Sequence, residues 1–456
     1  MDPDTTTLEQ LADDVVALIT ERGAAKAGGA TVEANVRASR SRHGLTRFAN
    51  SFIHQHVGED TATVAFTVAV DGRTASSSTT RVDVASLRES IDATIASAVE
   101  QPVDPHWPGA TPPIGVAPRG AFDPATAEGD PARRAGGVRD FVDAGAGLTA
   151  AGYLDTEASW EAFASTAGHR AADASTRATI DGIHQTARSA GSGHATSTRL
   201  GDLDAAAVGA RAADLARRSE DFVDVEPEAF EVVLAPEAVA TMLTFLAVYG
   251  FNAKAHLDGA SFAELGRTQF DPAVTILDDP TDPRAVGLGF DAEGSPRRGV
   301  TLVEDGVTRA LAHDRRTAGR TGATTTGGAI PGGEAFGAVP LSLRMPGGST
   351  SPADLVAGVE RGLLVTTFNY VRVLEPKRQL TTGLTRNGTF LIEHGEIGQA
   401  VGNLRFTESF VDALGPGRVL GIGEDDRLAD GEFGPGMVTC PSLRLARFAF
   451  TGGASG

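Results

Sequence analysis

Residues 230–280 read FEVVLAPEAVATMLTFLAVYGFNAKAHLDGASFAELGRTQFDPAVTILDDP, and this stretch is the most informative part of the chain. Its segment 241–250, TMLTFLAVYG, contains no histidine and is rich in apolar side chains. A hydrolytic zinc site needs about three protein ligands and one open position for water. Two histidines one helical turn apart can share such an ion, with a glutamate beside them that takes the proton from metal-bound water. The segment offers none of these groups, so we predict a buried structural helix.

Length and composition limit the class of protein. The chain has 456 residues, enough for two or three domains, and 41% of them are hydrophobic. The net charge of -19 repels phosphate backbones, which argues against nucleic acid as a direct partner. No apolar run approaches the ~20 residues that span a bilayer. The acidic start, MDPDTTTLEQLADD, lacks the basic and apolar regions of a signal peptide. We therefore expect a cytoplasmic protein without a membrane partner.

Cys440 is the single cysteine, so the chain can form neither an intramolecular disulfide nor a multi-cysteine metal site. We interpret it as a small buried residue beside Pro441 at the start of a strand. The alternative is that its thiolate binds a metal.

The N-terminal section, 1–115, has the pattern of helix, antiparallel strands and helix. Apolar residues at helical spacing predict helices over 5–22 and 85–100. Asp71-Gly72 is a hairpin turn signal. Alternating residues predict strands over Ala30–Ser39, Leu45–His56 and Thr61–Val70.

A Pro- and Gly-rich linker, 101–129, leads into a middle section, 116–222, with helices and strands rich in Ser, Thr and Ala. The third section, 223–456, is rich in short strands that Gly and Pro punctuate, which predicts a mostly antiparallel β domain. The fold class is therefore α+β. The strands that we expect in the third section are Phe230–Leu234, Ala273–Leu277, Val300–Glu304, Leu363–Val373, Thr389–Glu393 and Ser442–Thr451.

An ordered set of segments resembles the TldD/PmbA family. In the N-terminal part these segments are LTRFANSFIHQHV (45–57), VAVDGRTASSSTTRVD (68–83) and SLRESIDATIASAVEQ (86–101). After 230–280, the segments that match family patterns are FDAEGSPRRGVTLVEDGVTRALAHDRRTAGR (290–320), TGATTTGGAIPG (321–332), RMPGGSTSPADLVAGVERGLLVT (344–366), TTGLTRNGTFLIEHGEIGQAVGNLRF (381–406) and PSLRLARFAFTGG (441–453). The set resembles the PmbA (TldE) branch more than the TldD branch.

This resemblance implies a function as well as a fold. In catalytic members the helix after VVL-x-P carries His-Glu-x-x-x-His, and 241–250 lacks that motif. The family implies a heterodimer of a TldD-like and a PmbA-like chain that cleaves unfolded peptides. It implies that zinc belongs to the TldD-like partner, while the PmbA-like chain shapes the chamber and holds substrate. Both chains share one fold, so a homodimer is also an expectation.

The hydroxyl- and glycine-rich loop Thr325, Thr326, Gly327, Gly328 is the candidate substrate-binding site. Backbone exposed there could pair with an extended peptide. A flexible turn is the alternative, and a phosphate loop is excluded because no G-x-x-x-x-G-K pattern occurs.

Several histidines and carboxylates have a metal or catalytic alternative beside a structural interpretation. His54 and His56 face one side of a predicted strand and could bind a metal, although no third ligand is evident. His256 and Asp258 follow the apolar helix and could form a shifted metal site. Two carboxylate pairs, Asp278 with Asp279 and Asp291 with Glu293, could act in catalysis, but both are interpreted as structural turns.

Three functions remain open on the sequence. The first is a non-catalytic TldE/PmbA-like subunit of a TldD-type metalloprotease. The second is a metallopeptidase or other metalloenzyme with atypical ligands. The third is a non-enzymatic peptide-binding or regulatory protein. We assign no catalytic residue and no metal ligand to this chain.

Overall fold

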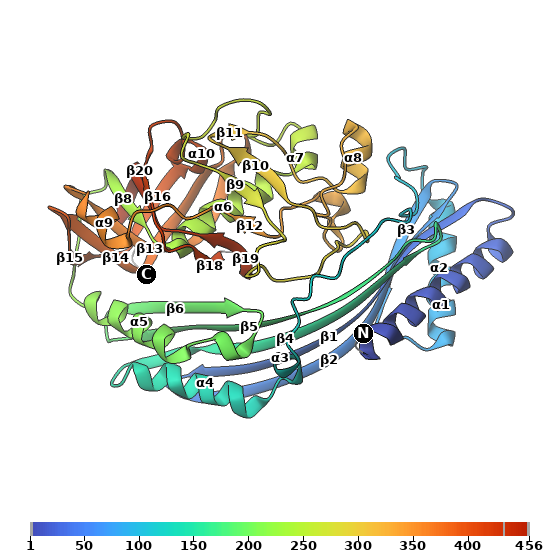
Figure 1. Cartoon of the computed structure of the whole chain (residues 1–456), viewed down its shortest axis with the longest axis horizontal. Coiled ribbons are helices and arrows are strands. Elements are labelled where there is room, and N and C mark those ends of the chain that lie inside the picture. The colour runs from blue at the N-terminus through green and yellow to red at the C-terminus, as the bar shows by residue number, and fades with distance from the viewer. Residues whose placement is uncertain (1–2, 432–433, 454–456) are drawn as a thin grey trace.

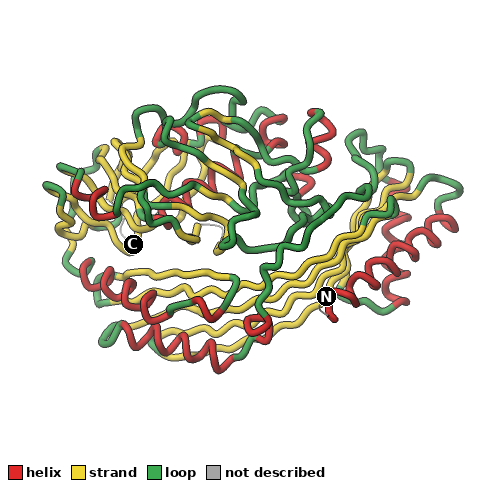
Figure 2. Tube along the Cα trace, in the orientation of Figure 1, coloured by secondary structure: helices red, strands yellow, loops and turns green. Residues whose placement is uncertain are grey.

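The computed structural model describes residues 3–431 and 434–453. A long, curved antiparallel sheet forms the N-terminal part, and a C-terminal part of two sheets with helices lies over one face of it (Figure 1). Strands of the N-terminal sheet run along much of the length of the molecule (Figure 2). The predicted α+β class with mostly antiparallel sheets is confirmed. Within the described ranges, no helix is long and apolar enough to cross a bilayer.

Six strands form the N-terminal sheet in the order β3-β2-β1-β4-β5-β6. Sections 1–115 and 116–222 supply three strands each, and they join where β1 pairs with β4, with Val36 opposite Ala164. The division of the chain into the three units 1–115, 116–222 and 223–456 stays a prediction. The bounds are β1 Val32–Ala49, β2 Phe52–Val70, β3 Arg73–Thr79, β4 Thr149–Ser165, β5 Arg170–Gln185 and β6 Ala190–Ser197.

Two turns of this sheet can be compared with the strands and turns that the sequence predicts. The prediction of one strand over Leu45–His56 is wrong, because the chain reverses at Asn50 and Ser51 between β1 and β2. These residues have φ of 51° and 64°, in the left-handed region that Asn tolerates better than most residues. The predicted turn at Asp71-Gly72 is confirmed: it joins β2 to β3 with φ of 46° and 76°.

Helices α1 and α2 cover one end of this sheet. Val15 and Ile19 of α1 and Ile91 of α2 are buried in one core with sheet residues such as Val36 and Phe66. The bounds of the helices in this half are α1 Pro3–Lys26, α2 Val84–Glu100, α3 Pro124–Glu128, α4 Pro131–Ala144 and α5 Ala205–Arg218.

Helices α4 and α5 cover the other end. Phe141 of α4 and Val208 of α5 pack with Phe48 and Leu154 of the sheet. Helices α1 and α4 lie on the side of the sheet away from the C-terminal part (Figure 1). The opposite face of the sheet is therefore turned toward the C-terminal part.

The C-terminal part consists of two sheets that both contact helix α6 (Pro236–Tyr249). One has the order β11-β10-β9-β12-β19-β18. Its bounds are β9 Ile276–Asp278, β10 Val300–Glu304, β11 Val307–Thr308, β12 Leu343–Arg344, β18 Arg427–Gly431 and β19 Gly434–Cys440. The other has the order β13-β8-β20-β16-β14-β15-β7, with β17 paired to β20. Its bounds are β7 Phe222–Val223, β8 Ala229–Leu234, β13 Arg361–Glu375, β14 Leu380–Glu393, β15 Glu396–Val401, β16 Leu404–Ser409, β17 Val419–Ile422 and β20 Leu443–Gly453. Four short helices complete this part: α7 Ala253–Leu257, α8 Arg315–Thr321, α9 Pro352–Ala357 and α10 Phe410–Ala413.

The predicted linker 101–129 is bound to the C-terminal part by arginine side chains. Arg315 Nη1 donates to the carbonyl of Gly109 at 2.7 Å. Arg119 of the linker donates through Nη2 to the carbonyl of Asp282 at 2.9 Å. These charge-assisted hydrogen bonds hold the linker across the gap between the two parts.

Candidate functional site

Helix α6 places the segment 241–250 in the core of the C-terminal part. Every residue from 238 to 247 is buried. Thr241 and Thr244 donate their hydroxyls to backbone carbonyls one turn earlier, at 3.1 and 2.7 Å. The hydroxyls are therefore used within the helix, and the predicted buried structural helix is confirmed.

Aromatic packing fills the far end of α6. The ring of Phe245 stacks on Tyr249 with centroids 5.8 Å apart and meets Phe410 edge-on at 6.3 Å. Such contacts suit a packed core. The segment 241–250 contains neither the imidazole nor the carboxylate groups that hydrolytic zinc requires.

The first turn of α6 carries a largely buried ion pair. Arg427 Nη2, from β18, lies 2.8 Å from each carboxylate oxygen of Glu237. Burial opposes ionisation of Glu237, but the charge and hydrogen bonds of Arg427 outweigh it and hold the pKa of Glu237 below its ordinary value. This carboxylate is committed to a structural role.

Cys440 lies beside this ion pair. Its Sγ donates to the carbonyl of Pro236 at 3.2 Å, and the residue is fully buried. Burial and the negative charge of Glu237 raise the pKa of the Cys440 thiol well above its ordinary value. The thiol therefore stays protonated, which disfavours a thiolate ligand. The prediction of a buried cysteine is confirmed, but Cys440 ends β19 and does not begin a strand.

One group of His and Asp side chains in the described ranges has the spacing of a metal site. Asp181 of β5, His194 of β6 and Asp430 of β18 offer ligand atoms that all lie within 4.8 Å of one another. None of the three is among the candidate ligands that the sequence suggests. No local pattern could reveal them, because Asp181 and His194 meet through the register of β5 and β6 and Asp430 comes from the other half of the chain.

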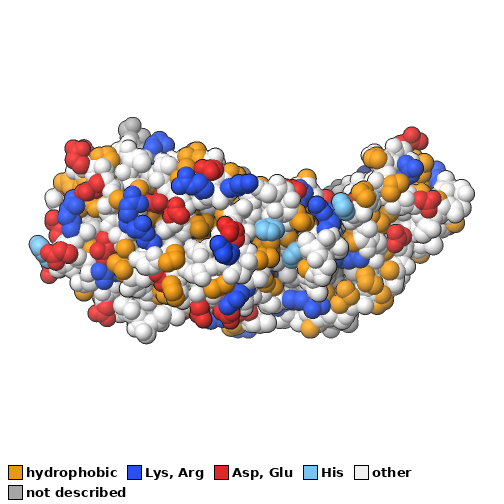
Figure 3. All heavy atoms as spheres, turned by 90° about the horizontal axis from the view of Figure 1, so that it is seen from above, with side chains coloured by type: hydrophobic (Ala, Val, Ile, Leu, Met, Phe, Trp, Pro, Cys, Tyr) orange, Lys and Arg blue, Asp and Glu red, His pale blue; other side chains and the backbone are white. Residues whose placement is uncertain are grey.

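A cleft lies between the N-terminal sheet and the C-terminal part, and residues 329–331 divide it into two hollows of about 440 and 460 Å³. Arg37 of β1 contributes to both hollows. Around the first lie Trp107 and hydroxyl side chains of β2 and β3. Around the second lie Phe290 and charged side chains of β4 and β5. In Figure 3, basic and acidic side chains are interspersed over the face seen from above.

Carboxyl groups in the walls of the cleft hold protons unusually tightly. Burial raises the pKa of Glu161 to about 7, partly offset by Arg37, whose Nη1 lies 3.5 Å away. Burial also raises the pKa of Asp291 and of Glu293, and the negative charge of Asp291 adds to the shift at Glu293. A protonated carboxyl donates as well as accepts hydrogen bonds. The cleft can therefore offer donors and acceptors to a peptide backbone.

The candidate loop Thr325–Gly328 runs into this cleft but is largely buried. Thr326 donates its N–H to the carbonyl of His313 at 2.9 Å, and its own carbonyl accepts from the N–H of Arg298 at 3.1 Å. Thr325 Oγ1 also donates to the carbonyl of His313. The expectation of exposed backbone is wrong at Thr326, because both of its backbone groups are already paired within the chain.

The two glycines of the loop are required by close packing. Gly327 has φ of +75°, and a Cβ there would lie 2.4 Å from the carbonyl oxygen of Pro296. A Cβ at Gly328 would lie 2.7 Å from the carbonyl oxygen of Val339. Direct substrate contact by Thr325, Thr326, Gly327 and Gly328 stays a prediction, and the adjoining residues 329–331 are the ones that line the cleft.

The structure does not bring together the predicted histidine sites. His54 and His56 are exposed on β2, and His56 contacts Thr46 and Arg134 at 3.2 and 3.4 Å. Neither belongs to the one metal-like group found in the described ranges.

The structure also does not support the possible metal site of His256 and Asp258 next to α6. Asp258 bonds Lys254 Nζ at 2.6 Å, one helical turn away. His256 lies in α7, and the group of potential ligands includes neither residue.

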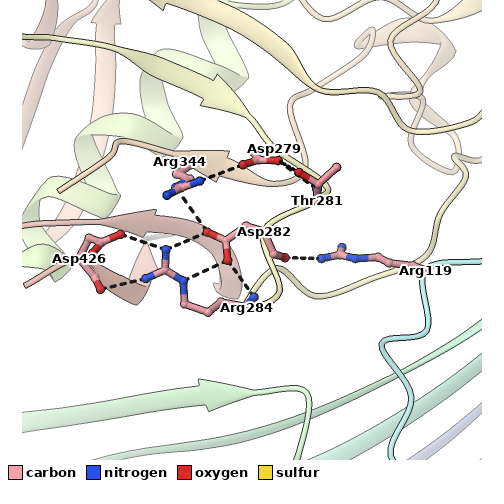
Figure 4. Close-up of polar contacts among 7 residues, drawn as sticks. All are labelled: Arg119, Asp279, Thr281, Asp282, Arg284, Arg344 and Asp426. Carbon is pink, nitrogen blue, oxygen red and sulfur yellow. Dashed lines mark hydrogen bonds and ion pairs between the residues drawn. The ribbon is translucent and has the colours of Figure 1, made fainter.

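Asp278 and Asp279 are structural, as the turn interpretation expects. Asp278 ends β9 and accepts from the N–H of Ser342 at 2.8 Å. Asp279 accepts from Arg344 at 3.0 Å. The close-up in Figure 4 shows how this turn belongs to an ion-pair network. Its members are Arg119, Asp279, Thr281, Asp282, Arg284, Arg344 and Asp426.

Asp291 and Glu293 form the expected turn before Gly294. Asp291 Oδ1 accepts from the backbone N–H groups of Glu293 and Ser295, both at 2.9 Å. Its other oxygen accepts from the N–H of Ala329 at 3.0 Å. The turn thereby fixes the residues that divide the cleft.

The chain is similar to proteins of a known family. Residues 227–452 match the profile of the PmbA/TldA metallopeptidase C-terminal domain. The chain belongs to the TldD/PmbA family. Among the relatives, a metalloprotease of Methanothermobacter thermautotrophicus is 28% identical over 219 residues, which is 46% of each chain. A metalloprotease TldD homolog of Buchnera aphidicola is 22% identical over 204 residues, 41% of this chain and 40% of the relative. The chain thus spans less than half the length of these curated relatives.

A solved structure supports the fold over nearly the whole chain. The crystal structure of TldE from Thermococcus kodakarensis matches with a TM-score of 0.85 and 15% identity, covering 97% of this chain and all of that one. At this identity the match concerns the fold alone. The metalloprotease names of relatives imply a metal in the family. In this chain the segment 241–250 of α6 does not fit that metal, because it contains no imidazole, carboxylate or thiol, and the hydroxyls of Thr241 and Thr244 are already bonded within the helix.

Proposed function

We propose that this chain is a non-catalytic, TldE/PmbA-like subunit of a TldD-type zinc metalloprotease that acts on unfolded peptides in proteolysis or peptide maturation. The observation that carries the proposal is the packed, apolar helix α6. In this proposal a TldD-like chain with His-Glu-x-x-x-His is the heterodimer partner and binds the zinc. The complex is cytoplasmic and uses neither a membrane nor a nucleic acid.

The groups around α6 support the proposal that the partner chain, and not this one, binds the metal and activates water. Metal-assisted hydrolysis needs an ion, an activated water and a general base. Around α6 of this chain, Glu237 is held by Arg427 and the Cys440 thiol is protonated. Neither group is free to act as base or ligand, so activation of water falls to the partner.

The cleft supports an extended peptide as the substrate. Each hollow has the size of a small-molecule site, so a folded domain does not enter, whereas a few residues of extended chain do. Arg37 offers guanidinium donors, and the raised pKa of Glu293 favours a protonated carboxyl that offers a further donor. Unfolded peptides expose the carbonyl groups that such donors recognise.

The deciding experiment uses three preparations: this chain, a His-Glu-x-x-x-His paralogue from the same genome, and the two co-expressed. Unfolded casein is the substrate. We expect co-purification of the two chains and cleavage only by the pair. A paralogue with Glu→Gln in its motif should abolish that cleavage while leaving the complex intact. Cleavage by this chain alone would contradict the proposal and favour an atypical metallopeptidase.

A second candidate is a non-enzymatic peptide-binding or regulatory protein, acting alone or as a homodimer. The observation that favours it is that both walls of the cleft belong to one chain, so binding needs no partner. Peptide binding by the lone chain, with no paralogue recovered and no cleavage in the mixture, would select this candidate.

A further inference from the structure

We propose that Asp181, His194 and Asp430 form a binding site for a divalent transition-metal ion of the Zn²⁺ class, which joins the N-terminal sheet to the C-terminal part. This inference is independent of the proposed function. The site lies outside the α6 segment 241–250.

The two ligands from the N-terminal sheet are held side by side. Asp181 and His194 are directly opposite each other in the register of β5 and β6. His194 Nδ1 lies 3.3 Å from Asp181 Oδ2. Ligand atoms bound to a tetrahedral zinc ion are separated by roughly 3.3 Å, given bond lengths of about 2.0–2.2 Å. These two groups are therefore already spaced as they would be around an ion.

The third ligand comes from the C-terminal part. Asp430 Oδ2, on β18, lies 3.8 Å from His194 Nδ1. Its other oxygen, Oδ1, is a buried atom with no hydrogen-bond partner among the described residues. The following residue, Gly431, lets β18 approach α6, because a Cβ there would lie 2.6 Å from Thr244 Oγ1. Asp430 thus has one carboxylate oxygen that faces His194 and a second, buried oxygen that lacks a hydrogen-bond partner in the described part of the chain.

His194 is oriented as metal-binding histidines are. The residue is 7% exposed, and its Nε2 lies 3.0 Å from Thr196 Oγ1. Thr196 is in turn 3.0 Å from Thr179 Oγ1. A bond of this kind at one ring nitrogen fixes the ring and leaves the other nitrogen to face the ion. Here the remaining nitrogen, Nδ1, faces both carboxylates.

Charge also favours a cation at this position. In the described part of the chain, neither Asp181 nor Asp430 has an arginine or lysine partner. The nearest arginine on β18, Arg427, is committed to Glu237. Two carboxylates this close repel each other unless a proton or a cation lies between them, and His194 Nδ1 is the one basic group that faces both of them in the described part of the chain. A divalent ion supplies a positive charge and completes a set of one imidazole and two carboxylates, which suits zinc.

The test uses the tag-free full chain, stripped with chelator and titrated with Zn²⁺ by calorimetry, with Co²⁺ absorption as a second readout. We expect about one ion per chain. His194→Gln and Asp430→Asn should each weaken binding at least about tenfold, and Thr196→Val should weaken it by about 10–100-fold. The matched control is His43→Gln, because His43 Nε2 lies 3.2 Å from Asp155 Oδ2 in the same sheet and faces one carboxylate.

The control variant and the unchanged chain together decide whether the metal site exists. The control should bind Zn²⁺ as the unchanged chain does, and all variants should give the same circular dichroism spectrum in chelator. No saturable binding by the unchanged chain would overturn the site. Equal loss in the His43 control, or full affinity in both the His194 and Asp430 variants, would overturn it as well.

Discussion

Arg427 holds Glu237 by two hydrogen bonds of 2.8 Å from a single guanidinium nitrogen, at the first turn of the helix that is apolar from 241 to 250. The pair ties β18 to α6. It therefore fixes both the packed helix and the strand that carries Asp430.

Removing one partner of this pair should be costly. Arg427→Met leaves Glu237, whose side chain is 15% exposed, without its countercharge. We expect a loss of about 2–3 kcal/mol in the free energy of unfolding, toward the lower end for buried pairs because Arg427 itself is partly exposed. Urea unfolding measures this loss.

The control for that prediction is the exposed pair Arg361–Glu228, with an N–O distance of 2.7 Å. Arg361→Met should cost less than about 1 kcal/mol. Similar losses in both variants would show that burial of the Glu237 pair contributes nothing.

The close approach at Gly327 gives a second prediction. Gly327→Ala combines a φ of +75° with a Cβ only 2.4 Å from a backbone oxygen, so the loop must shift. We expect destabilisation of about 2–4 kcal/mol in thermal or urea unfolding. Gly332→Ala is the matched control, because its φ is +68° but no atom lies within 4 Å of the added Cβ. It should cost about 1 kcal/mol.

Glu293 makes stability depend on pH. Burial and the charge of Asp291 raise its pKa above 4.5, so the folded chain binds this proton more tightly than the unfolded chain. Its contribution to stability is therefore present at low pH and is lost as pH rises from 4.5 through the raised value. Glu293→Gln should reduce the fall in urea midpoint between about pH 5 and about pH 8.

The exposed Glu304 is the control for this pH dependence. Glu304→Gln should leave the difference between the two midpoints unchanged. A Glu293→Gln chain with an undiminished fall would contradict the assigned role of Glu293.

Arg119 should govern the order of the linker. Arg119→Ala removes hydrogen bonds to the carbonyls of Asp282 and Val286 at 2.9 and 3.2 Å. We expect a loss of about 2 kcal/mol and faster proteolysis within 101–122. Arg309→Ala, which breaks an exposed pair with Glu304, should change neither.

Local patterns predict those parts of this fold that depend on neighbouring residues. The apolar run 241–250 predicts α6, and Asp71-Gly72 predicts the turn between β2 and β3, because helix burial and tight turns depend on a few consecutive residues. The turn at Asn50 and Ser51 was not predicted, because its Asn-Ser pair lacks the glycine that most two-residue hairpin turns contain.

Contacts between residues that are far apart in the chain could not be predicted, for a different reason. The pairing of β1 with β4 and the meeting of Asp181, His194 and Asp430 depend on strand register and on how the two parts stack. No spacing along the chain encodes these contacts. The same limit applies to Thr326, whose paired backbone could not be inferred from a hydroxyl- and glycine-rich loop.

In the proposed function this chain does not hydrolyse peptides alone and does so only in a complex with its partner. Metal content alone does not test this, because a bound ion at Asp181, His194 and Asp430 is compatible with it. The most direct measurement is turnover of unfolded casein by the zinc-supplemented lone chain, by its His-Glu-x-x-x-His paralogue and by their complex. We expect turnover only by the complex. Sustained turnover by the lone chain, abolished by chelator, would contradict it.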